Sequence, residues 1–252
     1  MPILHLHRDS TQNCTKYSII GNYAARPFVR HAALLKADTA LQFGADNVLV
    51  WHMGPPLVAG TKTIADLAAL PELIKERIKR TTVHIVGYLD LDLDDIEGIE
   101  TWLAEVDKEE RPMSSSSEEI IAQYRVSPAV HWVLAENDTP LYRQFSCIGF
   151  VIECYRFISI NLIDDSSTEN LPEVALDKIV AAYGPRANRE DFRKKIGIPG
   201  PGPWRILLAG YLFHSLDRDT DTIKHMAYIP KTISEFNFQV PDLPPPAEPV
   251  GL

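Results

Sequence analysis

The chain has 252 residues, of which 45% are hydrophobic and 23% are charged, and its formal net charge is −9. This length and composition are typical of a globular protein with a substantial core, and the acidic balance argues against nucleic acid or an anionic membrane as a partner. The three cysteines are too few for a disulfide framework. No segment has the length and apolar character of a membrane-spanning helix, and no signal-peptide pattern opens the chain. We therefore expect a cytoplasmic protein, or one exported without a cleavable signal peptide.

The N-terminal part of the chain predicts short strands separated by turns. Residues 2–7 alternate in the manner of an edge strand, and residues 18–20 end a strand before a Gly-Asn turn. Residues 30–36 are short and apolar, and residues 47–52 are rich in β-branched and aromatic side chains. Because turn residues lie between the last two segments, we expect them to belong to an antiparallel hairpin or meander.

The middle of the chain alternates between helical and extended patterns. Apolar residues recur at helical spacing over residues 63–80, and residues 81–89 form the second strong strand pattern. Residues 94–106 predict an acidic amphipathic helix, whereas the serine-rich residues 108–119 predict a loop. Residues 120–135 show no clear period.

The C-terminal half predicts helices first and strands later. The expected helices cover residues 147–160, 174–183 and 189–196, and the expected strands cover residues 204–213 and 222–229. This order favours an α+β fold in a single domain over residues 1–239. Residues 240–252 are rich in proline and predict an extended or disordered tail.

Cys147 is the candidate nucleophile. Ser146 precedes it and an apolar helical pattern begins at once, so the thiol is expected in the first turn of a helix. Free backbone N–H groups and the helix dipole favour a thiolate there, and the thiolate is the nucleophilic form. Gly149 would let a backbone or a substrate approach closely. Cys154 lies two turns later in mid-helix, where a cysteine usually packs as a small apolar side chain.

A cysteine nucleophile needs a base and a group that orients the base. His31 begins the segment of residues 30–36, and His52 ends the segment of residues 47–52. Antiparallel pairing of these two strands would bring both imidazoles together, so we expect His31 as the base and His52 as the orienting group. His225, after the cysteine, is the alternative base, and Tyr142 is either a packed aromatic residue or an oxyanion donor.

Two further patterns bear on metal binding. His5 and His7 share one face of the first predicted strand, but no third ligand is evident in the sequence. The acidic run of residues 90–95 lacks the glycine and glutamate of a calcium-binding EF-hand loop. We therefore expect no metal site and no cofactor.

Several of these segments resemble the circularly permuted NlpC/P60 (papain-like) clan, which includes the YiiX-type bacterial hydrolases and lecithin:retinol acyltransferase. The run His31-Ala32-Ala33-Leu34-Leu35 is similar to its histidine strand, and residues 145–155 are similar to the start of its cysteine helix. The resemblance covers residues 26–162, and residues 163–239 form a C-terminal extension without a counterpart. Ile148 departs from the pattern, because a small serine usually follows the cysteine.

The resemblance implies a papain-like fold in which an antiparallel sheet packs against the helix that opens with the catalytic cysteine. It implies a cysteine hydrolase that cleaves an amide bond in a peptide or in peptidoglycan through a thioester. Alternatives are an acyl-lipid transferase or lipase of the same clan and a non-catalytic binding module. The unpermuted order, with a strand containing His225 as the histidine strand, also stays open. The sequence predicts no oligomeric state.

Overall fold

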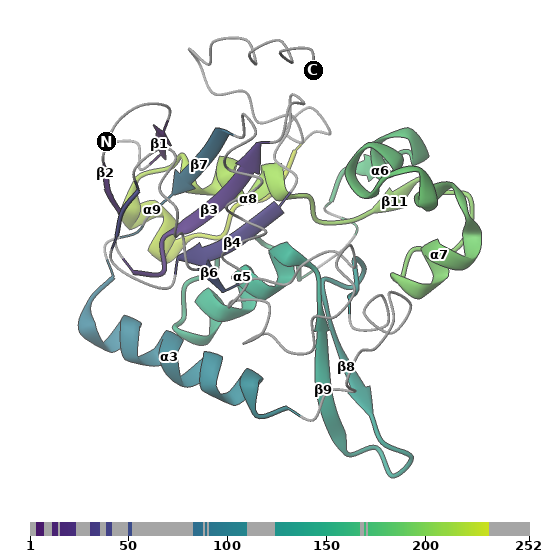
Figure 1. Cartoon of the computed structure of the whole chain (residues 1–252), viewed down its shortest axis with the longest axis horizontal. Coiled ribbons are helices and arrows are strands. Elements are labelled where there is room, and N and C mark those ends of the chain that lie inside the picture. Colours follow the sequence, from purple (N-terminus) through teal and green to yellow (C-terminus); the bar gives the residue numbers. More distant parts are fainter. Residues whose placement is uncertain are drawn as a thin grey trace, which may run out of the picture.

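The computed structural model describes residues 4–7, 12–14, 16–23, 31–35, 39–41, 50–51, 83–87, 89, 91–109, 124–166, 169 and 171–231. These residues form a mixed α/β fold with small antiparallel sheets (Figure 1). This arrangement agrees with the α+β class expected from the order of the sequence patterns.

The largest sheet has five strands in the order β1-β7-β3-β4-β6, and every neighbouring pair is antiparallel. Its strands are β1 (Leu4–His7), β3 (Ile19–Tyr23), β4 (His31–Leu35), β6 (Val50–Trp51) and β7 (Val83–Gly87). Strand β1 lies at one end of this order, as the alternation in residues 2–7 predicts. The predicted antiparallel pairing of the His31 strand is also confirmed, because Leu34 pairs with Trp51.

Three two-stranded sheets accompany the main sheet. They pair β2 (Gln12–Cys14) with β5 (Thr39–Leu41), β8 (Val130–Leu134) with β9 (Pro140–Phe145), and β10 (Glu173–Val174) with β11 (Trp204–Arg205). The β8–β9 hairpin projects away from the rest of the described chain (Figure 1). Its first strand, β8, lies within the segment of residues 120–135, where the sequence shows no clear period.

The helices are α3 (Leu93–Asp107), α5 (Cys147–Phe157), α6 (Leu176–Tyr183), α7 (Glu190–Lys195), α8 (Ala209–Leu216) and α9 (Thr220–His225), with a 3-10 turn η2 (Pro185–Asn188). Four of them match predicted helices, namely α3, α5, α6 and α7. The predicted helix over residues 63–80, most of the serine-rich loop and the proline-rich tail lie outside the described residues.

The two predicted C-terminal strands are wrong over most of their length. Residues 204–213 contain only the short strand β11 before helix α8 begins. Nearly all of α8 is buried, so apolar residues occur on most sides of the helix and show neither the helical nor the strand period clearly. Residues 222–229 mostly belong to α9 and the turn after it, and the Asp219 side chain caps α9 by accepting from the Thr222 N–H at 2.9 Å.

A single buried cluster joins the sheet to the helices. It includes Ile19 and Leu34 from the sheet, Trp102 from α3, Phe150 from α5 and Leu212 from α8. Helices α5 and α8 are in contact, and α5 also contacts α3 and β4. The cysteine helix is therefore the element around which the described core is built.

Gly87 shows how closely α8 approaches the sheet. A Cβ atom at this position would lie 2.6 Å from Leu216 Cδ1, so the absence of a side chain permits the contact. Residues of the main sheet that share a face with Gly87 therefore belong to the face that the helices cover.

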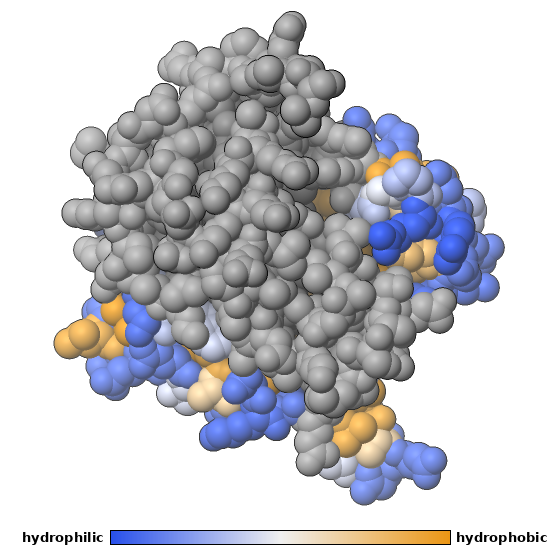
Figure 2. All heavy atoms as spheres, viewed as in Figure 1, coloured by the Kyte–Doolittle hydropathy of each residue, from blue (hydrophilic) through white to orange (hydrophobic). Residues whose placement is uncertain are grey.

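Figure 2 shows one face of the molecule. The described surface over α3 and over the region of α6 and α7 is mostly hydrophilic, and smaller hydrophobic patches interrupt it in both regions and near the β8–β9 hairpin. Exposed apolar side chains of that hairpin are Trp132, Leu134 and Leu141. Among the described residues, no helix combines the length and apolar character needed to cross a bilayer.

Candidate active site around Cys147

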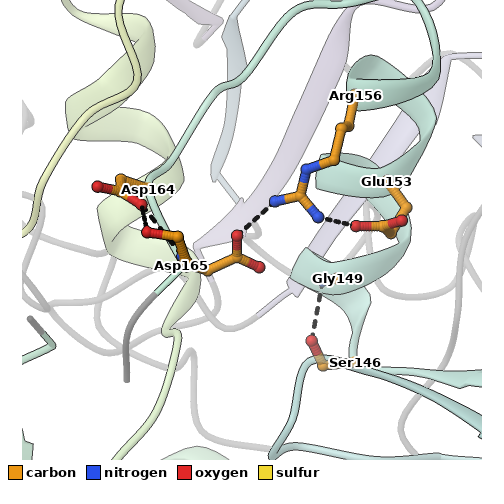
Figure 3. Close-up of polar contacts among 7 residues, drawn as sticks. Ser146, Gly149, Glu153, Arg156, Asp164 and Asp165 are labelled. Atoms are coloured by element: carbon orange, nitrogen blue, oxygen red, sulfur yellow. Dashed lines mark hydrogen bonds and ion pairs between the residues drawn. The ribbon is translucent and has the colours of Figure 1, made fainter. Parts of the chain in front are cut away.

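Cys147 is the first residue of helix α5, as the sequence predicts. Ser146 is the N-cap residue in an extended conformation, and its hydroxyl accepts a hydrogen bond from the Gly149 N–H at 2.9 Å (Figure 3). This bond satisfies one of the backbone donors that every helix leaves free in its first turn. The serine therefore fixes where the helix starts, and with it the position of the thiol.

Gly149 lets another backbone segment pack against this first turn. A Cβ atom at position 149 would lie 2.1 Å from the Ala129 carbonyl oxygen, which no side chain could tolerate. The same carbonyl accepts a hydrogen bond from the Ser146 N–H at 2.9 Å. The close approach expected at Gly149 is therefore made by the residues that lead into β8, and it holds the start of α5 against them.

Hydrogen-bond donors surround the Cys147 sulfur. The Tyr124 hydroxyl, the Ala32 backbone N–H and the backbone N–H groups of Ile148 and Cys147 itself each lower the pKa of the thiol. Burial has the opposite and larger effect, because the side chain is only 5% exposed, and the net result is a pKa above the usual value. The sequence predicts a thiolate at this position, whereas the structure shows a buried thiol with donors placed to stabilise one.

Tyr124 links the sulfur to a second tyrosine. Its side chain is 2% exposed and hydrogen bonds with the Tyr183 hydroxyl of α6, and the two rings meet edge to face with centroids 6.3 Å apart. Burial raises the pKa of both phenols, so both keep their protons at neutral pH. The Cys147 backbone N–H also contacts the Tyr124 oxygen, so the two phenols and the start of α5 belong to one hydrogen-bonded group.

His31 is the first residue of β4, directly before the Ala32 N–H that contacts the sulfur. In the register of the sheet it pairs with Asn22, and it alternates with Ala32, which belongs to the core cluster beneath α5. The structure describes His31 by its backbone alone. Ala32 brings the start of β4 to the thiol, and the alternation of the strand puts position 31 on the opposite face of the sheet from Ala32. The role of His31 as the base stays a prediction.

The structure bears differently on the other predicted partners of Cys147, which are His52, His225 and Tyr142. His52 lies outside the described residues, and its neighbour Trp51 pairs with Leu34, three residues along β4 from His31. His225 is the last residue of α9, so the histidine strand required by the unpermuted order is not formed there. Tyr142 lies in β9 opposite Val133, and the tyrosine that contacts the thiol is Tyr124.

Cys154 has no such surroundings. It is fully buried in the middle of α5, and burial is the one cause that raises the pKa of its thiol well above the usual value. The neighbouring Tyr155 hydroxyl donates to the Tyr17 carbonyl oxygen at 2.9 Å, which ties this turn to the residues before β3. The interpretation of Cys154 as a packing residue agrees with this environment.

The C-terminal end of α5 carries an ion-pair network (Figure 3). The Arg156 guanidinium bridges the carboxylates of Glu153 and Asp165, and a cation near a helix C-terminus is stabilised by the helix dipole. Burial raises the pKa of the Glu153 carboxyl, with Arg156 opposing that rise. This network anchors the helix on the side away from Cys147.

Among the side chains that the structure describes, no group of three or more His, Cys, Asp or Glu residues is arranged to hold a metal ion. Searches against protein-family models, curated proteins and solved structures found no match for this chain.

Proposed function

We propose that the protein is a cysteine hydrolase that cleaves an amide bond through a thioester intermediate on Cys147. The proposal includes a papain-like core of the permuted NlpC/P60 type, with the five-stranded antiparallel sheet and α5 as its two layers. The observation that supports it best is the set of donors around the sulfur at the start of α5. A purely structural cysteine needs none of these donors, since a buried thiol behaves as a small apolar group.

The raised pKa of Cys147 indicates how the nucleophile would be activated. Because the resting thiol keeps its proton, a base has to remove that proton as the sulfur attacks. His31 is the proposed base because its strand resembles the histidine strand of the clan, and it begins β4, the strand whose Ala32 N–H lies at the sulfur. An imidazole titrates near neutral pH and can accept this proton and later return it. His52 is the proposed orienting group.

The proposed reaction has two halves. The Cys147 thiol loses its proton to His31, and the sulfur forms a bond to the substrate carbonyl carbon while the carbonyl oxygen becomes an oxyanion. The C–N bond then breaks, the amine leaves with the proton from His31, and a thioester remains. Water, deprotonated by His31, attacks the thioester and releases a carboxylic acid and the free thiol.

The oxyanion would form where donors are already present. The Cys147 N–H lies at the helix start beside the sulfur and the Tyr124 hydroxyl, and the Tyr124 hydroxyl also lies at the sulfur. Donors of this kind stabilise charge that develops in the transition state without having to reorganise. Tyr124 thus takes the role for which the sequence offered Tyr142.

The chemical class of the substrate follows from the resemblance to the clan. We favour an amide in a peptide or in peptidoglycan, and transfer of an acyl group from a lipid or an ester is the alternative on the same thioester. The two differ in the acyl donor, an amide or an ester, and in what attacks the thioester, water or a second acceptor.

A non-catalytic binding module is the second candidate. One observation favours it, which is the low exposure of Cys147 together with its raised pKa. In that case the donors around the sulfur hold β4 and α5 in place relative to each other, and the thiol catalyses no reaction.

Trapping the acyl-enzyme separates these two candidates. The purified chain is mixed with p-nitrophenyl acetate, release of p-nitrophenol is followed, and acetylated peptides are located by mass spectrometry. We expect a burst of p-nitrophenol together with acetylation of Cys147. The Cys147→Ser variant should lose the burst by a factor on the order of 10⁶ in rate, the loss typical when a hydrolase loses its nucleophile.

Cys154→Ala is the matched control, since this thiol lies on the same helix without donors, and its burst should be unchanged. His31→Ala should suppress acetylation while circular dichroism shows an intact fold, whereas His225→Ala should not. Acetylation of Cys147 at the rate of a free cysteine would contradict the proposal and favour the binding module.

A further inference from the structure

Two phenols connect the thiol to the C-terminal extension, residues 163–239. Tyr124 lies before β8 and contacts the Cys147 sulfur, whereas Tyr183 is the last residue of α6 and packs against the core cluster. The two rings meet edge to face with centroids 6.3 Å apart, and their hydroxyls hydrogen bond. A charge on Cys147 also raises the pKa of Tyr183, so this hydroxyl lies near the sulfur as well. The extension therefore reaches the candidate site through the Tyr183 side chain.

The extension also holds the backbone that follows Tyr124. The Val126 N–H donates to the Ile196 carbonyl oxygen, at the end of α7, at 2.8 Å. Tyr124 itself forms a parallel bridge with Phe145, the last residue of β9. Since β9 leads directly into α5, residues 124–126 are fixed both to the hairpin before the thiol and to the extension.

Helix α6 is anchored well enough to give Tyr183 a defined position. Its residue Ile179 is fully buried in the core cluster. The strand that leads into α6, β10, is paired with β11, and the Arg205 guanidinium of β11 donates to the carbonyl oxygens of Glu169 and Leu171 at 2.8 and 2.7 Å. These contacts hold the chain before α6, so the Tyr183 hydroxyl meets Tyr124 from a fixed helix.

The count of hydroxyl protons connects Tyr183 to the charged state of the sulfur. A phenol has one proton to donate. A hydrogen bond to a thiolate is charge-assisted and about twice as strong as a neutral one, so Tyr124 gives its proton to the sulfur when Cys147 is ionised. The Tyr124 oxygen is then an acceptor for the Cys147 N–H and for the Tyr183 hydroxyl. Hydrogen bonds in such a chain strengthen one another.

We propose that Tyr183 is a positioning residue for the thiol chemistry, whose hydroxyl holds the Tyr124 hydroxyl on the Cys147 sulfur, so that the C-terminal extension completes the active site. The catalytic part of this inference rests on the proposed function, whereas the action of Tyr183 on the sulfur requires no turnover. The extension has no counterpart in the clan that the sequence resembles, and the proposal gives it a role in the site.

The test follows iodoacetamide labelling of Cys147 against pH in the 252-residue chain. Tyr183→Phe keeps the ring contact and removes the hydroxyl. The thiolate then loses part of its stabilisation, so the midpoint should move to higher pH and labelling at pH 8 should slow about twofold. In a Tyr124→Phe background the same substitution should change nothing, because Tyr183 acts through Tyr124. The p-nitrophenol burst should follow the same pattern.

Ile179→Val is the matched control, since it loosens the packing of α6 and keeps both hydroxyls. Its labelling midpoint should equal that of the wild type. An unchanged midpoint in Tyr183→Phe would overturn the proposal, as would equal shifts in the two backgrounds, which would mean that Tyr183 acts by packing alone. Absence of the burst in the wild type would overturn the proposed function and the catalytic role of Tyr183, whereas the labelling profile would still decide whether Tyr183 acts on the sulfur.

Discussion

Cys147 and Cys154 lie on the same helix, two turns apart, and both are buried, yet their surroundings differ sharply. The thiol of Cys154 meets apolar packing, and burial alone raises its pKa. The thiol of Cys147 meets hydrogen-bond donors from Tyr124, Ala32 and the helix start, which oppose the effect of burial. The comparison shows that the end of a helix, rather than its interior, gives a buried sulfur the partners needed to carry a negative charge.

Among the substitutions that test this comparison, Gly149→Ala is expected to cause the largest loss of stability. The new methyl group would meet the Ala129 carbonyl at 2.1 Å, so either the helix start or the residues before β8 have to move. Overpacking of this kind costs about 1–3 kcal/mol. Chemical denaturation should show a loss near the upper end of that range, and alkylation of Cys147 should change while that of Cys154 does not.

Gly98→Ala is the matched control for this substitution. Gly98 lies in α3, and its Cβ would meet the Ile158 side chain rather than a backbone carbonyl. A side chain can shift, and alanine gains about 1 kcal/mol of helix propensity over glycine. A loss of stability in Gly98→Ala equal to that in Gly149→Ala would contradict the role assigned to the Ala129 carbonyl.

Ser146→Ala should have an intermediate effect. It removes the hydroxyl that accepts from the Gly149 N–H at 2.9 Å and leaves that buried donor unsatisfied. Loss of such a cap costs about 0.5–2 kcal/mol, and burial favours the upper half of the range. The free energy of unfolding measures the effect.

Asp92→Ala is the corresponding variant at the start of α3, where the cap is exposed to water. Water can replace an exposed acceptor, so this variant should lose less stability than Ser146→Ala. The reverse order of the two losses would count against a special role for the buried cap beside Cys147.

The smallest effect is expected from Tyr124→Phe, and it should appear in reactivity rather than in stability. The hydroxyl of Tyr124 lowers the pKa of Cys147, so its removal moves that pKa further up. Below the pKa the thiolate fraction then falls, and the midpoint of the alkylation profile moves to higher pH. Iodoacetamide labelling at pH 8 should slow about fivefold, which corresponds to a hydrogen bond of about 1 kcal/mol.

Tyr155→Phe provides the control for this measurement. It also removes a buried phenol hydroxyl, but one that donates to the Tyr17 carbonyl near Cys154. Labelling of Cys147 should be unaffected. Equal slowing in both variants would mean that the Tyr124 hydroxyl acts through general packing and not through the sulfur.

The periodic elements of the fold could be predicted from the sequence. Helices α3 and α5 follow from apolar spacing and from Asp92 and Ser146 at their N-caps. Helix α8 could not, because a short segment that is apolar on most sides carries no period to read. The β8–β9 hairpin was missed because residues 120–135 alternate irregularly, and the pairing of β8 with β9 has a bulge between Val133 and Leu134.

The candidate site could be predicted only in its local part. The position of Cys147 in the first turn follows from its neighbours, and so does the close approach at Gly149. The donors Tyr124 and Ala32 come from distant parts of the chain, and no local pattern marks them.

The packing of α8 has a consequence for how this protein is made. The buried residues Tyr211, Leu212 and Phe213 belong to the core around α5, and Leu216 covers Gly87 of β7. During translation the sheet and the thiol helix leave the ribosome before α8 does, with their apolar faces still open to solvent. Residues to about Leu216 must therefore emerge before the core can close, and a messenger truncated upstream of them encodes a chain that aggregates rather than a smaller folded protein.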